Sequence, residues 1–166
     1  MGIKSFLAKP YAKWAIKQNQ KWINYPVETQ AKVFQNLIVT AATTVFGKDH
    51  NFSTIKNHQD FKAQVSVQDY EGLKKYVDRA VAGEADVLWK GKPIYFAKTS
   101  GTTSGEKYIP ITKESIPTHI KSAKDCLLNY VVESGDASFV NGKMIFLQGS
   151  PTLDNKNGID LGRLSG

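Results

Sequence analysis

The sequence predicts an α/β fold in which helices gather at the N-terminus, and a β-hairpin and further elements of a mixed sheet follow. Apolar residues recur every three or four positions in several segments of the first half, as in amphipathic helices. Two short apolar and aromatic runs, residues 93–97 and 108–111, then enclose a loop rich in Ser, Thr and Gly. A continuous apolar run covers residues 144–147. At 166 residues the chain is expected to form one domain with a hydrophobic core.

Three helices are expected before the hairpin. The first covers residues 5–23, and the second covers residues 28–46 with Gly47 as its natural stop. The third covers residues 69–82 and ends at Gly83. The apolar stripes of the first two are interpreted as packing faces; they consist of Phe6, Tyr11, Trp14, Ala15, Trp22 and Ile23, and of Val33, Phe34, Leu37, Ile38, Ala41, Ala42, Val45 and Phe46.

After the hairpin one more helix and one more strand are expected. Thr112 is a suitable N-cap for a helix to about residue 133, and Pro117 is early enough in it to be tolerated. Cys126 is interpreted as a small buried residue of that helix. The run 144–147 suits a strand buried on both faces. Everything beyond Pro151 is expected to be a loop rich in Gly and Asn.

The segment most informative about function is residues 98–107, which read Lys-Thr-Ser-Gly-Thr-Thr-Ser-Gly-Glu-Lys. Its glycines let backbone N–H groups turn toward one point, its hydroxyl groups add donors, and its lysines supply positive charge. These residue types in one loop point to an anion, and the polyphosphate of a nucleotide fits them best. A flexible Ser/Thr/Gly hairpin tip with nothing bound is the alternative.

The loop differs from the common phosphate-binding motifs. Gly101 and Gly105 are one residue too close for a Walker loop, and Glu106 stands where the second Walker glycine belongs. Pro110 argues against a helix after the loop, so the loop is expected to close a β-hairpin. The Gly-x-Gly-x-x-Gly fingerprint of dinucleotide-binding folds is also absent from the sequence.

The residues resemble a known family. Thr-Ser-Gly-Thr-Thr-Ser-Gly between two strands resembles the phosphate loop of the ANL adenylate-forming superfamily. The segments 43–52, 67–73, 87–89 and 95–97 resemble segments that recur in the same order in its auxin-responsive acyl-acid amido synthetase family, in the bacterial form. The resemblance covers about residues 30–151 and implies an enzyme that uses ATP and Mg²⁺ to join a small carboxylic acid to an amine or amino acid.

The resemblance also implies roles for the loop residues. Ser100, Thr102, Thr103 and Ser104 would donate hydroxyl hydrogen bonds to the phosphates, and Gly101 and Gly105 would donate through their backbone N–H groups. Thr102 and Lys107 are the candidate catalytic residues, with Lys107 as the cation. Lys107 stands one residue nearer the last loop glycine than the superfamily pattern places its lysine, so two alternatives stay open: Lys98 takes its place as the cation, or Lys107 points to solvent. No residue of this chain is assigned to a metal.

The resemblance further implies that residues 1–166 are the N-terminal part of a larger adenylate-forming domain, because the family's adenine, ribose and metal motifs have no counterpart here. Such a part would be inactive alone. Two other functions stay open: an acyl-CoA ligase, which shares the loop and the first half-reaction, and a non-catalytic nucleotide-binding module. Gly149 and Ser150 follow the last expected strand, where they either line the pocket or form a plain turn.

Composition excludes several classes of protein. Hydrophobic residues at 41% and charged residues at 22% exclude disorder, and the net charge of +7 is spread along the chain without a nucleic-acid-binding motif. Cys126 alone excludes a disulfide framework and fits a reducing cytosol. No secretory signal or membrane-spanning stretch is found, so a cytoplasmic protein is expected. The three histidines lack zinc-type spacing and are interpreted as surface or capping residues; they are His50, His58 and His119.

Overall fold

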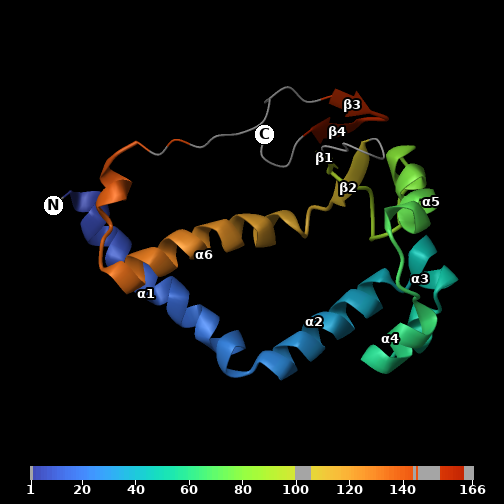
Figure 1. Cartoon of the computed structure of the whole chain (residues 1–166), viewed down its shortest axis with the longest axis horizontal. Coiled ribbons are helices and arrows are strands. Elements are labelled where there is room, and N and C mark those ends of the chain that lie inside the picture. The colour runs from blue at the N-terminus through green and yellow to red at the C-terminus, as the bar shows by residue number, and fades with distance from the viewer. Residues whose placement is uncertain (1, 100–105, 144, 146–153, 163–166) are drawn as a thin grey trace. The chain divides into compact units, whose positions relative to one another are not determined.

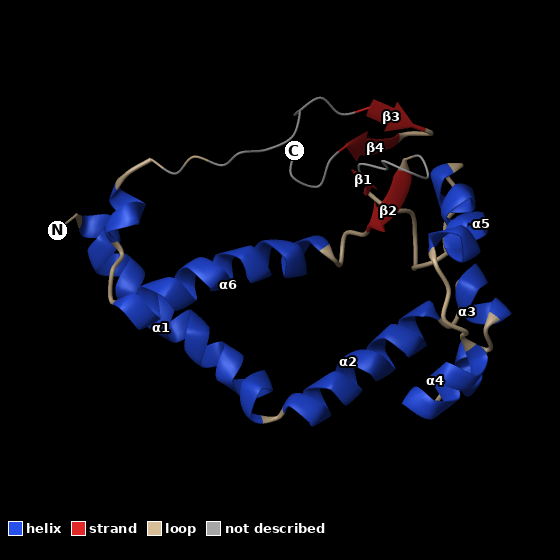
Figure 2. Cartoon of the chain, viewed as in Figure 1, coloured by secondary structure: helices blue, strands red, loops and turns tan. Residues whose placement is uncertain are grey.

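The computed structural model describes residues 2–99, 106–143, 145 and 154–162. Helices come first along the chain, and four strands follow with one long helix between the two pairs (Figures 1 and 2). The α/β fold class with N-terminal helices and a mixed sheet is therefore confirmed. The chain divides into two compact units, residues 1–30 with 114–147 and residues 31–113 with 148–166, and each is described by itself.

The first unit is built on the pairing of α1 (Ile3–Asn24) with α6 (Ile116–Ser134). The residues of α1 that become buried are small or polar: Ser5, Ala12 and Asn19, spaced by seven residues. That spacing places them on one side of the helix. Ala12 packs in a cluster with Leu128, Val131 and Ala137. Ala137 directly precedes the short 3₁₀ helix η2 (Ser138–Asn141).

The aromatic residues and Ile23 of the predicted stripe are not on the packing face of α1. Phe6 and Trp14 are 68% and 59% exposed, and Tyr11, Trp22 and Ile23 are exposed as well. The expectation that the stripe packs is therefore wrong for these five residues, whereas its sixth member, Ala15, packs against the cluster around Ala12. Small side chains such as Ala12 allow two helix backbones to approach closely. Asn19 donates to Asp125 on α6, and Ser5 donates to the carbonyl of Ala137 just beyond α6, so these residues form the seam instead.

The helix after the hairpin begins later than expected. Ser115, not Thr112, precedes its first turn, and Pro117 lies within that turn. A start at residue 112 would have placed Pro117 where its missing N–H and its ring disrupt the helix, whereas the first turn tolerates it. Gly135 ends the helix in the left-handed conformation, with φ of 69°. Cys126 on this helix is exposed, contrary to the expectation of burial.

The second unit contains the end of α2 (Pro26–Ala41) and three further α-helices. These are α3 (Val45–Asp49), α4 (His58–Gln64) and α5 (Tyr70–Val81), with the 3₁₀ helix η1 (Phe52–Thr54) between α3 and α4. The third predicted helix is confirmed as α5, with Asp69 as its N-cap and Gly83 beyond its end at φ of 91°. Among the described helices, none is long and apolar enough to cross a membrane.

The predicted helix over residues 28–46 is two helices, and Gly47 is not its stop. Gly47 lies inside α3, where its N–H donates to Thr44 Oγ1 at 3.0 Å. Thr44 caps α3 and also donates its hydroxyl to the carbonyl of Ala41, the last residue of α2, at 2.7 Å. The first two N–H groups of α3 donate to the carbonyls of residues 86 and 87. The chain breaks here because these distant carbonyls satisfy the N–H groups that a continuous helix would use.

The sheet has the strand order β2-β1-β4-β3. Its strands are β1 (Tyr95–Thr99), β2 (Lys107–Ile111), β3 (Asp154–Lys156) and β4 (Ile159–Gly162). β1 and β2 are antiparallel and form the predicted hairpin, whereas β1 and β4 are parallel. The expectation of a loop beyond Pro151 is wrong for residues 154–162. Asn157 and Gly158, both at positive φ, form the turn of a second hairpin, and Asn-Gly is the strongest short signal for such a turn.

The core of the second unit lies between α5 and the sheet. Phe96 is fully buried there, and its ring meets that of Tyr108 edge to face at a centroid distance of 6.2 Å. The buried members of this cluster are Tyr76, Val77, Ala80, Val81, Val87, Phe96, Ile159 and Leu161. The predicted strand over residues 144–147 lies outside the described residues except for Ile145, which is exposed and in no strand.

Candidate functional site

The candidate phosphate loop joins β1 to β2, and its central residues lie outside the part of the chain that the structure describes. The roles predicted for Ser100, Gly101, Thr102, Thr103, Ser104 and Gly105 therefore stay predictions. The structure does describe both strands up to the last pair before the loop, Thr99 opposite Lys107. It also describes Lys98 and Glu106, so the charges that flank the loop can be compared directly.

Lys98 is held by two carboxylates. Its Nζ lies 2.8 Å from Asp154 Oδ2 on β3 and 3.4 Å from Glu106 Oε1 at the start of β2. The hydrogen bond to Asp154 raises the pKa of Lys98, and the charges of Asp154 and Glu106 add to the effect against the cost of desolvation. The ammonium group is thus firmly protonated, and two negative charges offset its positive charge.

Lys107 is held differently. Its Nζ lies 5.4 Å from the centroid of the Tyr70 ring, which is within the range of a cation–π contact. No carboxylate among the described residues forms an ion pair with it. An aromatic ring is neutral, so this contact orients the ammonium group without cancelling its charge. Of the two lysines that flank the loop, Lys107 has the charge that an anion can use.

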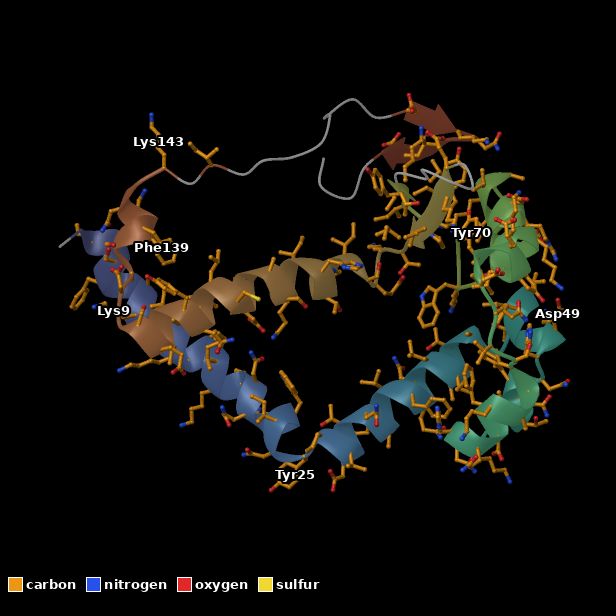
Figure 3. The ribbon with its side chains drawn as sticks, in the orientation of Figure 1. Lys9, Tyr25, Asp49, Tyr70, Phe139 and Lys143 are labelled. Carbon is orange, nitrogen blue, oxygen red and sulfur yellow. The ribbon has the colours of Figure 1, made fainter. Side chains whose placement is uncertain are left out.

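Tyr70 makes a second contact with the same strand. Its hydroxyl oxygen accepts a hydrogen bond from the backbone N–H of Tyr108 at 2.9 Å. Figure 3 labels the Tyr70 side chain. β2 is an edge strand, and Pro110, two residues on, has no N–H to offer. The backbone N–H groups of successive strand residues point to opposite sides of the strand, so the backbone nitrogens of residues 108 and 110 point to the same side. The outer edge of β2 therefore presents no free N–H at either position, which protects it from pairing with another strand.

Tyr108 lies among charged groups beside the loop. Its hydroxyl donates to Glu106 Oε2 at 3.2 Å, and Lys156 Nζ lies 5.4 Å from its ring centroid. Burial raises the pKa of the Tyr108 hydroxyl, and the hydrogen bond to Glu106 raises it further. The phenol therefore stays neutral near pH 7 and acts as a hydrogen-bond donor rather than as a base. The cluster Tyr70, Lys98, Glu106, Lys107, Tyr108, Asp154 and Lys156 is called the loop-base cluster below.

Sequence reasoning found the two lysines of the loop-base cluster but missed Tyr70 and Asp154. Tyr70 had a signal, since it lies in the segment 67–73 that supports the family resemblance, but it was expected only as a buried residue of the helix over residues 69–82. Asp154 had none, because the strand that carries it was expected to be a loop. Gly149 and Ser150, the other pocket candidates, lie outside the described residues.

The histidines take no part in the loop-base cluster. His50 stacks on Phe46 at a centroid distance of 4.1 Å, and its Nδ1 lies 2.9 Å from the Phe46 carbonyl oxygen. His58 is the first residue of α4, and His119 lies in α6. Within the described ranges, no three His, Cys, Asp or Glu side chains are grouped so that they could hold a metal ion.

Comparisons with known proteins cover this hairpin. The sequence profile of the GH3 family N-terminal domain matches residues 15–166, which include all four strands of the sheet. The chain is also similar to indole-3-acetic acid-amido synthetase GH3.15 from Arabidopsis thaliana, at 41% identity over 64 residues. That stretch is 37% of this chain and 11% of the plant protein, so the chain spans a small part of the length of the curated relative it matches.

Proposed function

Because this chain belongs to the GH3 family, we propose that it is part of an enzyme that activates a carboxylic acid with ATP and joins it to an amine or amino acid. The name of the plant relative supports this class of reaction. We further propose that residues 1–166 are the N-terminal part of a larger adenylate-forming domain. Residues 1–166 alone would be inactive. The lone cysteine fits a reducing compartment, and we place the protein in the cytoplasm.

The proposed reaction has two steps. An oxygen of the substrate carboxylate attacks the α-phosphorus of ATP, and the bond between that phosphorus and the bridging oxygen to the β-phosphate breaks, so that pyrophosphate leaves. The amine nitrogen then attacks the acyl carbon, the bond to AMP breaks, and the amine loses a proton as the amide forms. Negative charge grows on the β- and γ-phosphates in the first step, and donors fixed beforehand stabilise it best.

The loop and Lys107 would supply this stabilisation. The hydroxyl groups of Ser100, Thr102, Thr103 and Ser104 and the N–H groups of Gly101 and Gly105 are the proposed donors, with Lys107 as the cation. The observation that carries the proposal is the contrast between the two flanking lysines: Lys98 is paired with two carboxylates, whereas Lys107 rests on a neutral ring. Mg²⁺, when bound with ATP, would neutralise part of the charge of the phosphates, and no residue of this chain is assigned to hold it.

The proposal is tested by ATP–pyrophosphate exchange with the polypeptide of the complete reading frame, over a panel of aromatic and aliphatic acids. Exchange that depends on one acid is expected. Lys107→Gln should weaken ATP binding by about ten- to a hundredfold, because a hydrogen bond from a charged donor is worth about 1.5–3 kcal/mol.

Lys75→Gln is the matched control for this substitution. Lys75 also lies over a tyrosine ring, that of Tyr76 at 4.7 Å, but it is on α5 and outside the loop-base cluster. The control should bind ATP as the wild type does. Equal weakening in both variants would mean that Lys107 acts through overall charge alone, and no exchange with any acid would favour a non-catalytic binding module. Turnover with coenzyme A but not with amino acids would favour an acyl-CoA ligase.

A further inference from the structure

We propose that Tyr70 is a positioning residue that holds Lys107 and the start of β2 in place for the phosphates of ATP. The inference deepens the proposed function and rests on it. Tyr70 is the first residue of α5 and makes two contacts with adjacent residues of β2. Its hydroxyl accepts the Tyr108 N–H at 2.9 Å, and its ring lies under the Lys107 ammonium group at 5.4 Å.

The place of Tyr70 in the chain makes it a rigid support. Asp69 caps α5 by accepting the N–H of Gly72 at 3.0 Å, so the helix begins at a fixed residue. Buried side chains farther along the same helix anchor it to the sheet through Phe96. Tyr70 is itself partly buried against this cluster. The core therefore fixes the position of Tyr70, and Tyr70 in turn fixes the position of the end of β2 beside the loop.

The two contacts do different work. The hydrogen bond fixes the backbone of Tyr108, and because Lys107 is its neighbour it also fixes where the Lys107 side chain starts. The ring then restricts the rotation of the Lys107 side chain, whose conformational entropy binding would otherwise remove. A ligand meets a cation that is already ordered, which raises affinity. A carboxylate in place of the ring would order the ammonium group equally well but would cancel its charge, as Glu106 and Asp154 do for Lys98.

The test compares three variants of the polypeptide of the complete reading frame, with ATP and Mg²⁺ as the probe in calorimetric titration. Tyr70→Leu removes both contacts, whereas Tyr70→Phe removes only the hydroxyl group and keeps the ring. Tyr76→Phe is the matched control, because Tyr76 on the same helix donates a hydrogen bond of the same length, 2.9 Å, to Asp49. It removes one hydroxyl group from α5 without touching β2.

We expect Tyr70→Leu to weaken ATP binding about tenfold and Tyr70→Phe about threefold, since each contact is worth a factor of a few. Tyr76→Phe should leave ATP binding unchanged. In this chain, hydrogen exchange of the Tyr108 amide should be faster in both Tyr70 variants than in the control. The decisive measurement repeats Tyr70→Leu in a Lys107→Gln background, where it should weaken ATP binding no further.

Each other outcome overturns a stated part of the reasoning. If Tyr70→Leu weakens ATP binding equally with and without Lys107, Tyr70 acts on the fold in general and the inference is wrong, while the proposed function stands. If both Tyr70 variants bind ATP like the wild type, the inference is also wrong. If the wild type binds no ATP, the proposed function fails and the inference fails with it. Should Tyr70→Leu not fold, Tyr70→Phe in the same two backgrounds decides the matter.

Discussion

Replacement of Gly47 by alanine tests the break between α2 and α3. A Cβ atom on Gly47 would lie 2.0 Å from the carbonyl oxygen of Ala41 and 2.9 Å from its carbonyl carbon. Both atoms are backbone at the end of α2, and Thr44 holds the same carbonyl by a hydrogen bond of 2.7 Å. The added methyl group therefore cannot be accommodated by turning a side chain, and the α2–α3 junction itself must open.

The expected cost follows from this distance. Cβ atoms essentially never come within 3.0 Å of such a neighbour, so the two atoms must separate by about 1 Å (3.0 Å less 2.0 Å). Overpacking of a core costs about 1–3 kcal/mol, and a clash with fixed backbone belongs at the upper end of that range. Alanine is also more favourable than glycine inside a helix by about 1 kcal/mol, which offsets part of the cost of the clash. The two effects must therefore be measured separately.

Gly72→Ala provides that separation. Gly72 is also inside a helix, α5, and the atom nearest to a Cβ there is the end of the Gln68 side chain, which can move away. The propensity gain is the same in both variants, so their difference reports the clash, at about 3 kcal/mol. Urea unfolding followed by far-UV circular dichroism measures both free energies of unfolding. Hydrogen exchange of the α2 and α3 amides then locates the loss. If the two variants unfold at the same urea concentration, Gly47 and Ala41 are not in contact and the account of the break is wrong.

Three further predictions address the core, the α1–α6 pair and the loop. Phe96→Ala should lower the free energy of unfolding by about 3–5 kcal/mol in thermal or urea unfolding, because the ring is fully buried between α5 and the sheet. The Lys121 ammonium group, and then the Asn19 amide at 2.9 Å, lower the pKa of Asp125. The ionised Asp125 carboxylate should thus stabilise the fold fully above about pH 4, the usual pKa of an Asp carboxyl group, and this stabilisation should be lost as the pH falls below that value. In a plot of the urea midpoint against pH, Asp125→Asn should therefore reduce the fall of the midpoint below about pH 4. Thr102→Ala combined with Thr103→Ala should slow adenylation more than about tenfold in the exchange assay, since one such donor is worth about 2.7–4 kcal/mol, and near-normal exchange would reduce the loop to a hairpin tip.

The elements that were predicted well are those whose signal is local. α5 begins and ends where Asp69 and Gly83 predict, and β1 and β2 flank the loop as expected. The family inferred from the loop and the ordered segments is confirmed by the profile match. Each of these signals lies within a few consecutive residues, so no knowledge of distant contacts was needed to interpret it.

The elements that were predicted wrongly are of two kinds. The second hairpin had a local signal, Asn157-Gly158, that the expectation of a loop passed over. The choice of buried residues in α1 had no local signal, because apolar periodicity indicates which residues are able to pack and not which of them meet a partner. Ala12 and Asn19 became part of the seam because α6 offers them close packing and a polar partner, and Ser5 joined them because the carbonyl of Ala137, just beyond α6, accepts its hydroxyl.

The sequence by itself determined α1, α5, the first hairpin, the family and the identity of the two lysines beside the loop. Only the tertiary structure decided where α2 ends, which neighbours surround each lysine, and that Tyr70 reaches β2. The physical reason is that periodicity fixes the hydrogen bonds inside an element, whereas N–H groups at its ends and edges must be satisfied elsewhere. The first two N–H groups of α3 donate to the carbonyls of residues 86 and 87, and the N–H of Tyr108 donates to the hydroxyl of Tyr70. These partners lie about forty positions away along the chain.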